Sequence, residues 1–197
     1  ITPYFFNLID PADEHCPIRW QVIPRVEETH TAPWEMTDPC GEDAHSPVPG
    51  LVHRYPDRVL FLVTDRCAAY CRYCTRSRLV GKTGEYHFNT KQFQAAIDYI
   101  AAHPEIRDVL ISGGDPLTLV DERLGELARR LARINHVRRL RIHTRLPIMI
   151  PQRVTDELLD WLRGTHLMPI MVVHANHAQE IDEPTAAALT RLVDHGI

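Results

Sequence analysis

From residue 58 to its end, the chain alternates short apolar runs, rich in β-branched residues, with amphipathic stretches of helical period. A continuous apolar run predicts a strand buried on both faces, as in a parallel sheet. After a longer first crossover the runs recur about every thirty residues, which is the spacing of βαβ units with right-handed crossovers. We therefore predict an α/β fold with strands at 58–64, 108–112, 138–144 and 169–174 and helices at 89–103, 120–134, 155–162 and 184–195.

These four βα units leave two architectures open. One is an open four-stranded sheet, and the other is a partial (β/α) barrel with outer helices, interrupted after its fourth unit. Gly196 and Ile197 stand where a glycine would end the fourth helix and a fifth strand would begin.

Residues 1–57 have a different texture from the rest of the chain. They carry most of the prolines and show no sustained hydrophobic period, so we expect irregular chain with short helical or turn pieces. The chain is thus predicted to divide into an N-terminal extension, 1–57, packed on a main body, 58–197.

Charge and hydropathy exclude two classes of function. The formal net charge of −4 lacks the strongly basic balance of a dedicated nucleic-acid-binding domain. No apolar run approaches the ~18 residues that span a bilayer, and the N-terminus lacks a signal-peptide pattern. We expect a cytoplasmic protein without a membrane or nucleic-acid partner.

Three of the five cysteines, Cys67, Cys71 and Cys74, form a CxxxCxxC motif directly after the first predicted strand. Thiolates at this spacing can converge on one metal centre, and soft sulfur ligands select zinc or an iron–sulfur cluster. Three ligands leave one coordination position open, which is a catalytic arrangement. The alternative is a zinc site completed by a distant histidine, Cys40 or Cys16, and thus a non-catalytic scaffold.

A second motif, Ser112-Gly113-Gly114-Asp115, follows the second predicted strand. Glycines allow a backbone to approach a ligand closely, and Asp115 offers an acceptor for an ammonium group. By itself the motif is typical of an ordinary turn. Its position at the end of the strand after the cysteine motif makes it a stronger indication of a ligand-binding site.

The two motifs together resemble the radical S-adenosylmethionine superfamily, in which three cysteines hold a 4Fe–4S cluster and S-adenosylmethionine chelates the fourth iron. The wider sequence resembles the lysine 2,3-aminomutase family over essentially the whole chain. The segments that carry this resemblance are 1–4, 16–19, 46–51, 53–58, 63–65, 67–76, 112–115, 151–153 and 174–177.

The resemblance implies a role for several further residues. Arg54, Tyr55 and Arg58 match positions that hold the phosphate of pyridoxal 5′-phosphate, and Arg76 matches an arginine that binds the substrate α-carboxylate. Ser112 to Asp115 and His174 match contacts to S-adenosylmethionine. Ser77 departs from the run of arginines usual in the lysine enzymes.

The implied reaction moves the 2-amino group of L-lysine to carbon 3, with a 5′-deoxyadenosyl radical removing and returning a hydrogen. The same chemistry on glutamate, or on a lysine side chain of elongation factor P, is the alternative, and the segment 143–147 favours the latter. Family analogy also implies an external electron donor for the cluster and a homo-oligomer.

Lysine is scarce, since Lys82 and Lys91 are the only lysines among the 22 Lys and Arg residues of the chain. Pyridoxal phosphate enzymes rest as a Schiff base on a lysine, and neither of these two matches the family's motif for it. We therefore expect a truncated part of a longer protein. The Schiff-base lysine, the acidic residues that bind the substrate amine and the family's zinc cysteines would lie beyond Ile197.

Overall fold

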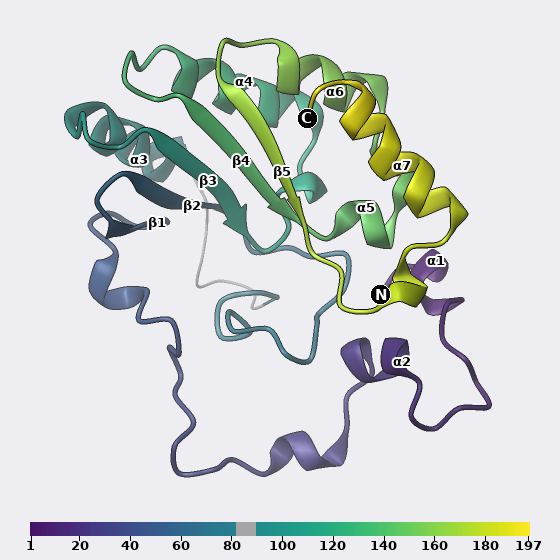
Figure 1. The fold of residues 1–197 in the computed structure, drawn as a ribbon. Coiled ribbons are helices and arrows are strands. Elements are labelled where there is room, and N and C mark those ends of the chain that lie inside the picture. Colours follow the sequence, from purple (N-terminus) through teal and green to yellow (C-terminus); the bar gives the residue numbers. More distant parts are fainter. Residues whose placement is uncertain (82–89) are drawn as a thin grey trace.

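The computed structural model describes residues 1–81 and 90–197; Lys82 and Asn89 lie outside the described residues. Its centre is one five-stranded sheet with the strand order β1-β2-β3-β4-β5 (Figure 1). The strands β2 to β5 are parallel, which confirms the predicted α/β fold. The strands are β1 (Leu51–Tyr55), β2 (Arg58–Thr64), β3 (Asp108–Gly113), β4 (Arg139–Thr144) and β5 (Met168–Val173).

Four longer helices connect or follow the parallel strands, and they lie on the same side of the sheet (Figure 1). Burial on β4 shows the same asymmetry, because Leu140 and Ile142 are buried while Arg139 and Arg141 are half-buried. Helices on a single face are typical of a barrel wall, so the structure favours the partial barrel. The helices are α3 (Thr90–Ala102), α4 (Asp121–Ala132), α6 (Asp156–Arg163) and α7 (Glu183–Asp194).

Side-chain caps fix where two of these helices begin. Thr155 accepts a hydrogen bond from the Leu158 amide ahead of α6, and Asp182 accepts one from the Thr185 amide ahead of α7. Both satisfy an amide that has no partner inside the helix. The shorter helical pieces are α1 (Pro3–Phe6), α2 (Pro17–Val22), α5 (Leu146–Met149) and the 3-10 turns Val26–Thr29, Asp43–His45, Pro116–Thr118, Pro151–Arg153 and Ala178–Glu180.

Strand β1 was not predicted. It lies in the segment assigned to the N-terminal extension, yet it pairs antiparallel with β2 through a tight turn at Pro56 and Asp57. Proline fixes the backbone angle that such a turn needs at this position. The sheet therefore begins before the predicted boundary at residue 57.

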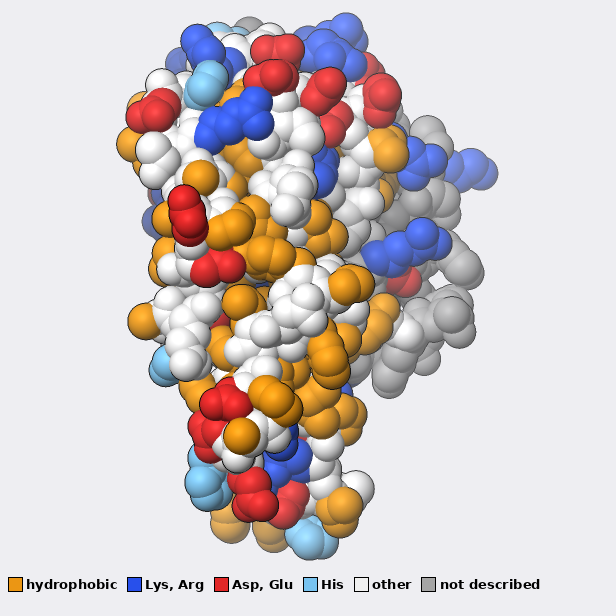
Figure 2. Space-filling model, turned by 90° about the vertical axis from the view of Figure 1, so that its right-hand side faces the viewer, with side chains coloured by type: hydrophobic (Ala, Val, Ile, Leu, Met, Phe, Trp, Pro, Cys, Tyr) orange, Lys and Arg blue, Asp and Glu red, His pale blue; other side chains and the backbone are white. Residues whose placement is uncertain are grey.

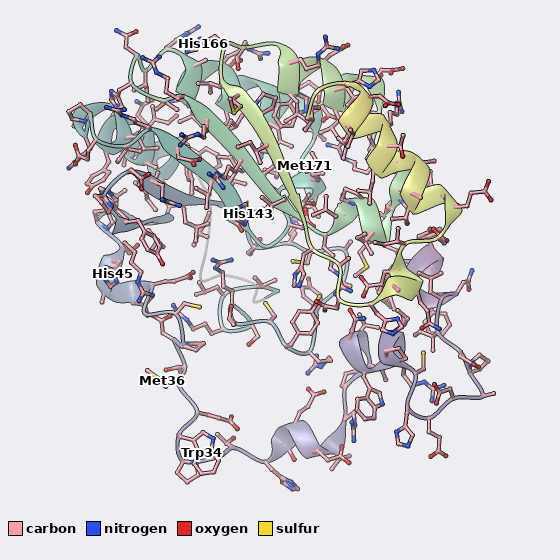
Figure 3. The ribbon with its side chains drawn as sticks, in the orientation of Figure 1. Trp34, Met36, His45, His143, His166 and Met171 are labelled. Carbon is pink, nitrogen blue, oxygen red and sulfur yellow. The ribbon has the colours of Figure 1, made fainter. Side chains whose placement is uncertain are left out.

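The N-terminal segment passes beyond the carboxyl ends of the parallel strands (Figure 1). Phe5 and Ile18 are completely buried in the core, and the Thr2 hydroxyl donates a 2.6 Å hydrogen bond to the Met149 carbonyl. Trp34 and Met36, in contrast, project from the long loop and are 81% and 70% exposed (Figure 3).

Seen from the side of α7, hydrophobic side chains run along the middle of the surface and charged ones gather toward its two ends (Figure 2). Among residues 1–81 and 90–197, no helix is both long and apolar enough to cross a membrane.

Candidate active site

A pocket of about 450 Å³ lies at the carboxyl ends of the parallel strands. This volume falls in the range of small-molecule sites, and this edge of a parallel sheet is where such ligands bind. Loops after β2, β3, β4 and β5 all contribute to it. The predicted site residues that line it are Cys67, Cys71, Cys74, Arg76, Ser112, Gly113, Gly114, Asp115 and His174.

The three cysteines of the motif share this pocket without closing on one point. Among the described residues, no three Cys, His, Asp or Glu side chains are grouped closely enough to hold a metal ion. Burial raises the pKa of the Cys67 thiol to about 12 and also raises that of Cys74. Metal ligation requires the thiolate form, so Cys67 and Cys74 would release their protons on binding a metal. The donor set therefore fits an iron–sulfur cluster by its chemistry and its shared pocket.

The zinc alternative required a further ligand for these cysteines. Cys16 is buried near the N-terminal segment, where its Sγ accepts a hydrogen bond from the Asp10 amide. Neither Cys16 nor Cys40 lines the pocket of the motif cysteines. Neither cysteine is therefore placed to complete a zinc site with the three motif cysteines.

The two glycines of the Ser112–Asp115 motif are required by the packing of two backbones. A Cβ on Gly113 would lie 2.3 Å from the Thr64 carbonyl oxygen, and one on Gly114 would lie 2.3 Å from that of Arg66. Gly113 also has a φ of +119°, which L-residues rarely adopt. The glycines were predicted to allow close approach of a ligand, and the structure shows that they also allow close packing against the backbone at Thr64 and Arg66.

Asp115 is turned inward. It is 6% exposed, and its carboxylate accepts hydrogen bonds from the Thr144 hydroxyl at 2.7 Å, the Arg145 amide at 2.7 Å and the Leu117 amide at 3.1 Å. Burial raises its pKa, although these donors act in the opposite direction. The carboxylate thus joins β3 to the end of β4 while it also lines the pocket, and its contact with an ammonium group stays a prediction.

Arg76 reaches the pocket with its guanidinium already paired. Its Nε lies 2.9 Å from Glu42 Oε1 and its Nη2 lies 2.7 Å from the same oxygen. Glu42 belongs to the N-terminal segment and is 7% exposed. The Arg76 guanidinium thus lines the pocket while Glu42 occupies its Nε and Nη2.

Two histidines line the far side of the pocket. His174 follows β5, and its ring meets that of Tyr73 edge-on with 5.7 Å between the centroids. His143 on β4 lies in the same pocket (Figure 3), and its buried Nε2 has no partner among the described residues. Burial lowers the pKa of His143, and the cations of Arg141 and Arg76 lower it further, so the ring favours its neutral form.

The remaining predicted residues, Arg54, Tyr55 and Arg58, lie outside this pocket. They belong to the β1–β2 hairpin, where Arg58 pairs with Asp57 at 2.9 Å and Arg54 donates to the Cys40 carbonyl at 3.0 Å. Arg58 begins β2 and the cysteine loop follows its end, so the length of the strand separates them by ~20 Å. The structure therefore brings together the cysteine, glycine and His174 positions but not the three phosphate positions.

Several polar residues of the site were missed by sequence reasoning. Gln21, Glu42 and Glu180 are all buried, and each contacts a residue far away in the chain, such as Gln21 with Glu180 at 2.7 Å. None belongs to a recognisable local motif. Only their burial in three dimensions identifies them.

The chain is similar to known proteins over its whole length. The model of the Radical SAM superfamily matches residues 61–189. The chain is 48% identical to the L-lysine 2,3-aminomutase of Acetoanaerobium sticklandii over 100% of this chain and 47% of that protein. It is 48% identical to that of Bacillus subtilis, over 100% and 41%, and 40% identical to that of Escherichia coli, over 98% and 56%. The chain thus spans about half the length of the curated relatives that it matches.

Proposed function

This chain belongs to the radical SAM superfamily, and we propose that the protein is an L-lysine 2,3-aminomutase, which moves the 2-amino group of L-lysine to carbon 3. One observation carries the proposal. The motif cysteines, the Ser112–Asp115 turn, Arg76 and His174 line a single pocket at the carboxyl ends of the strands. The similarity of the whole chain to about half the length of enzymes named L-lysine 2,3-aminomutase supports L-lysine as the substrate.

Each group of residues receives a role in this proposal. Cys67, Cys71 and Cys74 hold the 4Fe–4S cluster, while Ser112, Gly113, Gly114 and His174 contact S-adenosylmethionine. When bound and reduced by an external donor, the cluster and S-adenosylmethionine supply a radical that removes a substrate hydrogen, and pyridoxal phosphate carries the migrating amino group.

The protein's own part is to bind and orient. Arg76 holds the amino-acid carboxylate, which shares the guanidinium with Glu42 or displaces it. The resemblance assigns the phosphate of pyridoxal phosphate to Arg54, Tyr55 and Arg58, and two guanidinium groups and a phenol suit a phosphate dianion. These residues lie ~20 Å from the cysteine loop, however, so the geometry gives this assignment no support.

The test is to reconstitute the intact protein with iron and sulfide without oxygen and to assay β-lysine by mass spectrometry. We expect a brown protein that forms β-lysine from L-lysine but no amino-shifted product from glutamate. Cys71→Ser should lose iron and activity, while the matched Cys40→Ser, outside the pocket, should keep both. A colourless protein that retains zinc, or one that acts only on glutamate or a protein-bound lysine, would overturn the proposal.

A further inference from the structure

Arg145 is the most highly connected side chain beside the cysteine loop. It follows β4 and is 8% exposed. Its Nη1 donates to Cys71 Sγ at 2.9 Å and to the Tyr73 hydroxyl at 2.5 Å. Its Nη2 donates to Glu180 Oε2 at 3.0 Å and to Gln21 Oε1. One guanidinium thus joins a motif cysteine to the N-terminal segment and to the loop after β5.

The orientation of this guanidinium is fixed from several directions. Glu180 is completely buried, and its other oxygen accepts from Gln21 Nε2 at 2.7 Å and from the His177 amide at 3.1 Å. The Arg145 amide donates to Asp115 at 2.7 Å, which anchors the backbone as well. Because its partners are themselves bonded, Arg145 reaches Cys71 without a further loss of side-chain freedom.

The charge of Arg145 is retained in this buried place. Its Nη2 lies 3.0 Å from the Glu180 carboxylate, and the guanidinium of arginine stays protonated in proteins. Its Nε is also buried and has no partner among the described residues. A permanent cation, with one N–H group unpaired among the described residues, is therefore hydrogen-bonded to the sulfur of Cys71.

We propose that Arg145 is a positioning residue that acts through Cys71, raising the reduction potential of the cluster by donating an N–H to the ligating sulfur. Hydrogen bonds to cluster sulfurs and nearby positive charge stabilise the more negative, reduced form. Glu180 has the opposite effect on the reduction potential, because its negative charge partly offsets the positive charge of Arg145. It also holds the guanidinium in place. The inference rests on the proposed cluster site and not on the choice of amino-acid substrate.

The experiment is a redox titration of the reconstituted intact protein, followed by electron paramagnetic resonance of the reduced cluster. Arg145→Gln should disfavour reduction about tenfold, equivalent to ~59 mV more negative for one electron. Glu180→Gln breaks the same ion pair but removes the negative charge, so it should shift the potential the other way. Arg145→Lys, which keeps the charge without the fork, should fall between wild type and Arg145→Gln.

Arg153→Gln is the matched control. Arg153 forms a similar, mostly buried ion pair with Asp121 at 2.8 Å but does not line the pocket. The reduction potential of the cluster in the Arg153→Gln protein should therefore equal that of wild type. A merely structural role would give Arg145→Gln and Glu180→Gln the same sign of shift, or none, and would overturn the proposal. If Arg145→Gln fails to assemble a cluster, Arg145→Lys and Glu180→Gln still test whether the reduction potential shifts in the expected directions.

A wild-type protein that assembles no cluster contradicts both this inference and the proposed function. A cluster with the expected shifts but without β-lysine formation contradicts only the proposed reaction.

Discussion

Glu42 and Arg76 form a two-point ion pair beside the candidate active site, although Glu42 lies in the N-terminal segment and Arg76 in the loop after the cysteines. The Glu42 carboxylate occupies the guanidinium in the way that an amino-acid carboxylate would. An incoming substrate must therefore share Arg76 with Glu42 or displace it.

The first prediction concerns this arginine. Arg76→Gln should raise the KM for L-lysine and reduce kcat/KM about 100-fold, because a charged two-point contact is lost. The control is Arg78→Gln, since Arg78 pairs with Asp43 at 2.9 Å and with Asp38 at 3.3 Å but does not line the pocket. Steady-state kinetics would contradict the assignment if the two variants lost activity equally.

The second prediction concerns Gly113. Gly113→Ala should destabilise the protein by about 3 kcal/mol or more, because its Cβ would press on the Thr64 carbonyl in a backbone conformation that alanine rarely adopts. Gly41→Ala is the control with a φ of +61° and no atom within 4 Å of the new Cβ, and it should cost only about 1–2 kcal/mol. Urea unfolding measures both, and equal losses would argue against the close backbone contact.

The third prediction concerns Asp115. Asp115→Ala should cost about 3 kcal/mol, because it leaves the Thr144 hydroxyl and the Arg145 and Leu117 amides without their buried acceptor. Asp194→Ala, at an exposed position near the end of α7, should change the free energy of unfolding by less than about 0.5 kcal/mol. A stable Asp115→Ala protein with weakened S-adenosylmethionine binding would instead support the role expected from the sequence.

The fourth prediction concerns acid stability. The Tyr4 hydroxyl and the Thr185 amide donate to Asp182, and these bonds hold the pKa of Asp182 below its ordinary value although burial opposes them. The stabilisation is therefore complete above the unfolded pKa near 4 and is lost as pH falls through the folded pKa. Tyr4→Phe should reduce the fall in Tm between pH 6 and pH 3, and Tyr70→Phe, at an exposed tyrosine, should leave that fall as in wild type.

Strand β2 could be predicted because Arg58–Thr64 is an almost continuous apolar run, and β4 because Leu140 and Ile142 supply apolar side chains at alternate positions. Strand β1 could not, since Leu51–Tyr55 is short and ends in polar residues, and its pairing depends on a turn at Pro56. Spacing placed the cysteines and Asp115 after adjacent strands, where a parallel sheet gathers its carboxyl ends.

The polar framework around those motifs was beyond sequence reasoning. Gln21 and Glu180 contact each other across 159 positions, so no local pattern relates them. Asp115 shows the other limit, because its residue type suits both a ligand contact and an internal acceptor. Only the structure shows that three internal donors surround it.

The Gln21 carbonyl, which accepts the Arg72 amide at 2.8 Å, has a consequence for protein engineering. A chimera that grafts only the strands and helices from residue 58 onward would carry the complete cysteine motif. It would nevertheless leave behind β1, the anchor of the cysteine loop and the partner of Arg76. The smallest transferable form of this site therefore includes α2 and the segment that joins it to the sheet.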